Sequence, residues 1–264
     1  LRDANEKKQI RGAFSQYLSP ALVEQLAENP DKLVLGGETK KMTFLFCDVR
    51  DFTAISELFK KNPQGLTKLI NRFLTPLTNE IINHNGTIDK YMGDCIMAFW
   101  NAPLGIDLHE KMACEASLKM HKALKKLNEE RKKEAEQNNS VFLELKIGIG
   151  INTGNCVVGN MGSEQRFDYS VLGDSVNLAS RLEGQSKGYG VKTIIGSETY
   201  ETLKNEFAIL KLDLIAVKGK KEAVAIYTLL GNNELKNQNS FKDLELKHNL
   251  MLNSYFNQNW LEAS

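Results

Sequence analysis

Two apolar runs, each adjoining an aspartate, constrain the fold of this chain most strongly. The run MTFLFC (42–47) ends at Asp48, and the run CIMAFW (95–100) begins directly after Asp94. Short apolar runs bounded by turn residues are typical of buried strands. If the two strands are neighbours in one sheet, both carboxylates lie at strand ends beside tight turns. Such a pair of carboxylates is a hard-oxygen site that suits Mg²⁺ or Mn²⁺.

An alternative interpretation is that each aspartate only caps a turn, which is the usual role of an isolated Asp between structural elements. A pair of divalent ions held by carboxylates would instead activate an oxygen nucleophile and neutralise a transferring phosphoryl group. The residues around the two aspartates favour the second interpretation.

The surrounding motifs resemble the catalytic domain of the class III nucleotidyl cyclases. They are FCDVRDFT (46–53), DKYMGD (89–94), GIGINTG (148–154), VGNMG (158–162), YSVLGDSVNLASRLE (169–183) and VKGK (217–220). The resemblance covers roughly residues 40–230, with the motifs in the order and at the spacings of the family. It implies an α+β fold with a ferredoxin-like βαββαβ core and additional strands and helices, the class III cyclase fold.

The hydrophobic pattern independently predicts the order β-α-β-β-α-β, which is that of a ferredoxin-like core. Strands are expected at about 41–48, 87–91, 95–100, 141–152, 156–159, 191–195, 209–217 and 223–230. Helices are expected at about 53–60, 64–84, 107–136, from Ser175 onward, and at 197–204. Pattern and resemblance therefore agree on the fold class.

Three segments are expected along the chain. Residues 1–36 form a helical leader, 37–231 the cyclase catalytic domain, and 232–264 a C-terminal tail that is weakly ordered or wraps the surface as a helix. Two interpretations of the leader stay open: a coupling element to an upstream sensor or membrane domain, or a helix packed on its own domain. Because the chain begins at Leu1 rather than Met, we expect it to be part of something longer.

Composition limits the partners and the compartment. Lys and Arg total 34, Asp and Glu total 33, and the net charge is +1, so nothing argues for binding nucleic acid. The four cysteines show no CxxC pairing, which favours buried thiols in a reducing compartment. No apolar run approaches the roughly 20 residues of a membrane helix. We expect a cytoplasmic protein, or the cytosolic portion of a membrane-anchored one.

The resemblance implies specific roles at the site. Asp48 and Asp94, with the backbone carbonyl of Val49, would hold two divalent metal ions, Mg²⁺ or Mn²⁺. Asn177 and Arg181 are four residues apart on a predicted helix and hence lie on one face. That spacing lets an amide orient the ribose while the planar guanidinium, whose fork matches phosphate oxygens, reaches the α-phosphate.

Further phosphate contacts are also implied by the resemblance. Lys218, in a Lys-Gly-Lys turn, matches the triphosphate lysine of the family, and Lys220 is the fallback. Arg166, four residues before Ser170, is an additional phosphate candidate.

Base selection rests on two positions. Lys90 can donate to adenine N1, which is an acceptor, whereas guanine N1 is a donor; guanylyl members usually carry Glu there. The partner position is Asp in many adenylyl members and Thr in one subclass, and here it is Ser170. A hydroxyl can accept from the adenine amine but can also donate, so it discriminates less. Since the Thr subclass includes bicarbonate-responsive enzymes, a bicarbonate response is a hypothesis for this chain.

The resemblance also implies a site formed between two catalytic domains. One domain supplies the metal aspartates and the other supplies the base, ribose and phosphate contacts. This chain carries both sets, which predicts a symmetric head-to-tail homodimer with two sites.

The expected function is an adenylyl cyclase that converts ATP to 3′,5′-cyclic AMP and pyrophosphate. The 3′-hydroxyl would attack the α-phosphate with the assistance of two metals. Two alternatives stay open: a guanylyl or purine-tolerant cyclase, against which Lys90 argues, and a catalytically silent nucleotide-binding signalling domain, against which the complete set of site residues argues.

Overall fold

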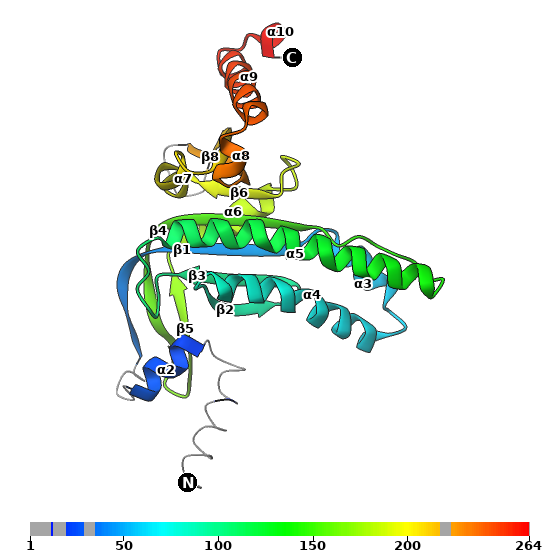
Figure 1. The fold of residues 1–264 in the computed structure, drawn as a ribbon. Helices are drawn as coiled ribbons and strands as arrows, with labels where there is room; N and C mark the ends of the chain where they lie inside the picture. The colour runs from blue at the N-terminus through cyan, green and yellow to red at the C-terminus, as the bar shows by residue number, and fades with distance from the viewer. Residues whose placement is uncertain (1–11, 13–19, 29–34, 217–222, 264) are drawn as a thin grey trace.

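The computed structural model describes residue 12 and residues 20–28, 35–216 and 223–263, and is centred on one eight-stranded sheet (Figure 1). The strands are β1 (Gly36–Val49), β2 (Thr87–Met92), β3 (Cys95–Trp100), β4 (Ile147–Ser163), β5 (Arg166–Leu172), β6 (Thr193–Gly196), β7 (Ala208–Ile215) and β8 (Val224–Gly231). The helices are α2 (Pro20–Glu28), α3 (Phe52–Leu58), α4 (Pro63–Asn83), α5 (His109–Gln137), α6 (Asp174–Gln185), α7 (Ser197–Leu203), α8 (Asn233–Lys236), α9 (Asn239–Phe256) and α10 (Trp260–Ala263).

The sheet order confirms the expected ferredoxin-like core. The strands lie in the order β2-β3-β1-β4-β6-β8-β7, and β5 pairs with β4 outside this path. Helices α3 and α4 connect β1 to β2, and α5 connects β3 to β4, which gives the βαββαβ unit with β1 between β3 and β4. The strands β6, β7 and β8 then extend the sheet beyond β4.

Both faces of the central strand β1 are buried, which explains its continuous apolar run. Phe44 and Phe46 pack in one hydrophobic cluster, whereas Leu45 and Cys47 pack in another. Successive side chains of a strand point to opposite faces, so a strand covered on both sides needs apolar residues at every position. The helices α4 and α5 lie together along one side of the core strands (Figure 1).

The structure differs from the sequence-based prediction around β4. Separate strands at 141–152 and 156–159 were predicted, but β4 is one strand over Ile147–Ser163, and residues 141–146 lie outside any strand. The glycines in this segment resemble turn residues, yet pairing with β1 runs unbroken from Val49↔Ile147 to Gly36↔Asn160. The antiparallel partner, rather than local propensity, holds the segment extended.

The structure also adds a strand, β5, and shows helices in the segment after β8. Strand β5 was not predicted, because its residues alternate between exposed and half-buried before reaching Ser170 and carry no apolar run. The segment after β8 is helical: Phe241 is buried against Leu210, and α9 projects away from the sheet (Figure 1). Within the expected leader, residues Pro20–Glu28 form the helix α2.

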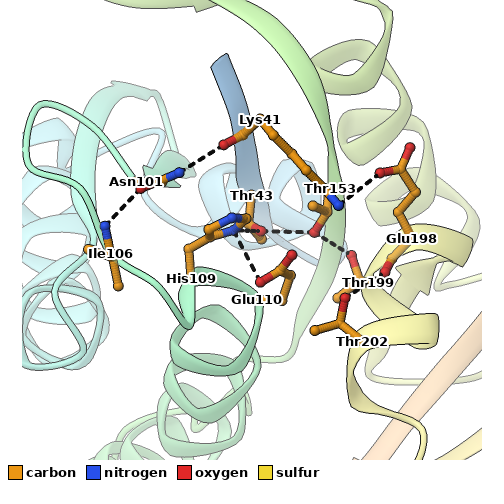
Figure 2. A network of polar contacts seen from close by, with 10 residues as sticks. All are labelled: Lys41, Thr43, Asn101, Ile106, His109, Glu110, Thr153, Glu198, Thr199 and Thr202. Carbon is orange, nitrogen blue, oxygen red and sulfur yellow. Dashed lines mark hydrogen bonds and ion pairs between the residues drawn. The ribbon is translucent and has the colours of Figure 1, made fainter.

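A buried chain of hydroxyl contacts ties the helices to the sheet (Figure 2). Thr43 Oγ1 on β1 lies 2.7 Å from His109 Nδ1 on α5 and 2.8 Å from Thr153 Oγ1 on β4. Thr153 Oγ1 in turn lies 2.9 Å from Thr199 Oγ1 on α7. Buried polar groups are costly unless they are paired. This chain of contacts therefore ties α5 and α7, which also contact each other, to the two central strands β1 and β4.

His121 gives the fold a testable dependence on pH. Its Nε2 lies 2.9 Å from Thr193 Oγ1, and burial lowers the pKa of His121 to about 4. The unfolded chain, with an ordinary histidine pKa of about 6.5, takes up the proton first as the pH falls. The free energy of unfolding is therefore unaffected by His121 above about pH 6.5. It falls as the pH drops from there toward 4, by about 3 kcal/mol at most.

We expect His121→Gln to remove this dependence, because glutamine does not titrate but can still hydrogen-bond Thr193. Urea unfolding at pH 7 and pH 5 should show that the wild type loses about 2 kcal/mol more stability than the variant over this interval. Equal losses for the two proteins would contradict the assignment.

Candidate active site

The structure places Asp48 and Asp94 next to each other, as the sequence predicted. Strand β1 pairs antiparallel with β3 through Cys47↔Ile96, so the end of β1 lies beside the turn that precedes β3. Gly93 makes that turn with a φ of +66°, a value that favours glycine. Burial, followed by the neighbouring Asp48 carboxyl, raises the pKa of Asp94 to about 6. The carboxyls of Asp48 and Asp94 are therefore neighbours in a partly buried site.

This pair fits a divalent cation. Two carboxylates held together in a partly buried place repel each other, and a hard cation with oxygen ligands relieves that repulsion. The Val49 N–H donates to Asp48 Oδ1 over 2.9 Å and holds that carboxyl in place. Within the described ranges, no cluster of three or more His, Cys, Asp or Glu side chains is arranged to hold an ion. The side-chain donors of the candidate metal site are thus the two aspartates.

A third carboxyl approaches the pair and had no role in the sequence-based prediction. Glu183 lies on α6, and burial, followed by the charge of Asp48, raises its pKa to about 7. Its carboxyl passes over Gly148, the residue that pairs with Asp48 across β1 and β4. The only signal in the sequence was its place at the end of the longest motif. Glu183 is thus a third titratable carboxyl beside the candidate metal site.

Glycines in β4 let α6 lie directly on the sheet. A Cβ added at Gly150 would lie 2.2 Å from Glu183 N and 2.3 Å from Ala179 O. These are backbone atoms of α6, so no side chain can rotate out of the way. The sequence GIGINTG thus serves as a flat surface for the helix that carries Asn177 and Arg181.

Asn177 and Arg181 share the outer face of α6, as the i, i+4 spacing predicted. Both are exposed, whereas Ala179 and Leu182 are fully buried. Within the described residues, the Asn177 and Arg181 side chains make no hydrogen bond or ion pair. An amide and a guanidinium on one exposed face are therefore available to a ligand or to a second chain.

Lys90 and Ser170 are brought together through Asp89, which the sequence-based prediction missed. The Ser170 hydroxyl donates to Asp89 Oδ2 over 2.6 Å, and Lys90 Nζ lies 3.4 Å from Asp89 Oδ1. The Asp89 side chain is 1% exposed, whereas that of Lys90 is 42% exposed. The signal in the sequence was its place in DKYMGD, directly before Lys90.

The remaining predicted phosphate contacts are not assembled here. Arg166 is exposed at the tip of the β4–β5 hairpin, opposite Ser163. Four residues of strand separate it from Ser170, about 13 Å at the rise of a β-strand. Lys218 and its fallback Lys220 lie outside the described residues. Within the described part, no hydrogen bond or ion pair joins Asp48 or Asp94 to Lys90, Ser170, Asn177, Arg181 or Arg166.

The family model of the adenylate and guanylate cyclase catalytic domain matches residues 36–231. The chain belongs to this family. It is 33% identical to an adenylate cyclase of Anabaena cylindrica over 84% of this chain and 44% of that protein. It is 31% identical to adenylate cyclase 1 of Rhizobium meliloti (strain 1021) over 83% of this chain and 32% of that protein. The chain thus spans less than half the length of these curated relatives.

Solved structures confirm the class III cyclase fold. The adenylyl cyclase CyaB from P. aeruginosa is similar with a TM-score of 0.63 and 35% identity, over 74% of this chain and 96% of that one. The guanylyl cyclase Cya2 is similar with a TM-score of 0.66 and 33% identity, over 77% and 98%. Because both kinds of cyclase are about equally similar, the choice of base depends on particular side chains. None of the described helices is long and apolar enough to cross a membrane.

Close packing of α6 on β4 predicts opposite effects for two glycine substitutions. Gly150→Ala would force α6 off the sheet, and we expect a loss of at least about 2 kcal/mol in the free energy of unfolding. Gly184→Ala, in α6 itself, meets nothing within 4 Å and should stabilise the protein by about 0.5–1 kcal/mol through helix propensity.

Urea unfolding of the two variants checks this prediction. Equal effects of the two alanines would show that α6 does not depend on the bare backbone of β4.

Proposed function

We propose that this domain is an adenylyl cyclase that converts ATP to 3′,5′-cyclic AMP and pyrophosphate. The observation that carries the proposal is the convergence of Asp48 and Asp94 at the β1–β3 edge, in a chain of the cyclase family. The 3′-oxygen forms a bond to the α-phosphorus, the bond to pyrophosphate breaks, and the 3′-hydroxyl proton leaves to solvent or to the substrate.

Asp48 and Asp94, together with the backbone carbonyl of Val49, would hold two divalent ions, Mg²⁺ or Mn²⁺. When bound, such ions lower the pKa of a hydroxyl and offset phosphate charge. Asn177 orients the ribose through its amide. Arg181, which has no partner within the described residues, meets the α-phosphate with its planar, permanently charged guanidinium.

Lys90 supports ATP as the substrate. Its ammonium is exposed enough to reach a ligand, and it donates to adenine N1, whereas guanine N1–H would face it as a second donor. A guanylyl or purine-tolerant cyclase is the nearest alternative because one similar structure is a guanylyl cyclase. A catalytically silent nucleotide-binding domain is a further alternative, and the presence of both aspartates with Lys90, Asn177 and Arg181 argues against it.

Shared sites in a head-to-tail homodimer are part of the proposal, because one chain carries both residue sets. Asp48 and Asp94 of one subunit would face Lys90, Asn177 and Arg181 of its partner, giving two equivalent sites. Lys218 and Arg166 are proposed as additional phosphate contacts.

We also propose the bounds of the catalytic domain, the roles of its flanking segments and its compartment. The domain spans 37–231, residues 1–36 couple it to an upstream sensor or membrane domain, and 232–264 form a tail. We place this domain in the cytoplasm. A bicarbonate response through the hydroxyl at Ser170 is part of the proposal, and a bicarbonate titration at fixed pH that leaves activity unchanged would remove that part.

Mixing two inactive variants tests the shared site. We expect Asp48→Ala and Asn177→Ala each to lower cyclic AMP formation by at least about 100-fold, a typical cost of removing a positioned charged or polar group. Random mixing makes half of the dimers mixed, and each mixed dimer has one intact site of two. An equimolar mixture should therefore recover about a quarter of the wild-type activity.

Asp51→Asn is the matched control, because Asp51 lies three residues from Asp48 but its carboxyl is paired with Lys187 at 2.6 Å. This variant should keep near wild-type activity alone. If both inactive variants dimerise and their mixture stays inactive, the shared site is wrong.

A further inference from the structure

The contact between Ser170 and Asp89 decides what Ser170 can offer a ligand. A serine hydroxyl has one proton to donate and two lone pairs that accept. Here the proton is directed to Asp89 Oδ2 over 2.6 Å, a length typical of a hydrogen bond to an ionised carboxylate. Ser170 is therefore left with lone pairs alone. The sequence could not show this, because a free hydroxyl at this position would accept or donate equally.

A β-bulge brings Asp89 to this place. The pairing of β2 with β3 shifts between Ile88↔Ala98 and Lys90↔Met97, which leaves Asp89 as the extra residue. In a regular strand, neighbouring side chains point to opposite faces, so Asp89 and Lys90 would be far apart. A bulge re-aims side chains, and here the Lys90 ammonium lies 3.4 Å from Asp89 Oδ1.

The carboxyl of Asp89 is held firmly between these two groups. Its side chain is 1% exposed, and its Oδ1 has no hydrogen-bond donor within the described part of the chain. Burial raises the pKa of Asp89, while the hydrogen bond from Ser170 and the charge of Lys90 act against that rise. Because a buried carboxylate left without its partners is costly, the hydrogen bond from Ser170 to Asp89 is strongly favoured.

We propose that Asp89 is a positioning residue that sets base selectivity, by committing Ser170 to accept and by holding the ammonium of Lys90, which can only donate, beside it. This inference rests on the proposed function. The resulting pair matches adenine, whose N1 accepts and whose exocyclic amine donates. Guanine is mismatched at both positions: its N1–H meets the Lys90 ammonium, and its O6 meets the lone pairs of Ser170. Asp89 itself stays behind the two groups and does not touch the base.

Asp89→Asn tests the proposal with little change in shape. The asparagine amide can donate to Ser170 Oγ, which frees the hydroxyl proton for guanine O6. We expect the ratio of kcat/KM for ATP to that for GTP to fall at least about tenfold, the effect of about 1.4 kcal/mol. Asp168→Asn is the matched control: it removes the same charge from an exposed residue of β5, two positions before Ser170. Its ratio should stay within about twofold of the wild type.

A double-variant cycle separates positioning from general disruption. If Asp89 acts through the hydroxyl, Asp89→Asn should lower the ratio far less in a Ser170→Ala background than alone. Full additivity of the two changes would overturn the proposal, as would an unchanged ratio in Asp89→Asn. A drop of the same size in the Asp168→Asn control would also overturn it, because charge alone would then explain the effect.

Binding of nucleotides that cannot react keeps this test independent of the proposed activity. Nucleotides without a 3′-oxygen cannot be cyclised, so calorimetry with 3′-deoxy-ATP and 3′-deoxy-GTP gives the selectivity of binding alone. Preference for the adenine nucleotide that weakens in Asp89→Asn supports the proposal, even if the wild type forms no cyclic product and the proposed function fails. A wild type that binds both equally overturns it.

Discussion

The structure depends on the pairing of β1 along both of its edges. One edge pairs with β3, which sets Asp48 beside the turn that carries Asp94. The other edge pairs with β4 over the full length of β1, from Gly36 to Val49. Since β4 carries the glycines on which α6 lies, this one strand fixes the candidate metal ligands and also the helix of Asn177 and Arg181. A shift of one residue in either register would turn the site residues to the wrong face.

Carboxylates are used in two different ways around this framework. Within the described residues, Asp48 and Asp94 lie together without a basic partner, and burial followed by the neighbouring Asp48 carboxyl raises the pKa of Asp94. Asp89 is the opposite case, because its Oδ2 accepts a hydrogen bond from Ser170 and the Lys90 ammonium lies 3.4 Å from its Oδ1. The first arrangement suits a cation, and the second, in our proposal, sets what two neighbouring side chains offer to a ligand.

Much of the core could be predicted from the sequence, because strands that are buried on both faces must be continuously apolar. This is why β1, β3 and the order of the ferredoxin-like core were visible, and why Asp48 and Asp94 could be paired in advance. The length of β4 and the existence of β5 could not, since their residues are glycine-rich or half-exposed and are held extended by their partners. Asp89 was missed for a similar reason. Its place directly before Lys90 was visible in DKYMGD, but the β-bulge that turns its side chain toward Ser170 is set by the pairing of β2 with β3.

The most direct test of the central claim is product formation by the purified chain, with ATP or GTP as substrate, in Mg²⁺ or Mn²⁺, over a range of protein concentrations. The account predicts cyclic AMP from ATP, little cyclic GMP from GTP, and a specific activity that rises with protein concentration as shared sites form. Cyclic GMP as the main product, or no cyclic product at any concentration with either metal, would contradict it.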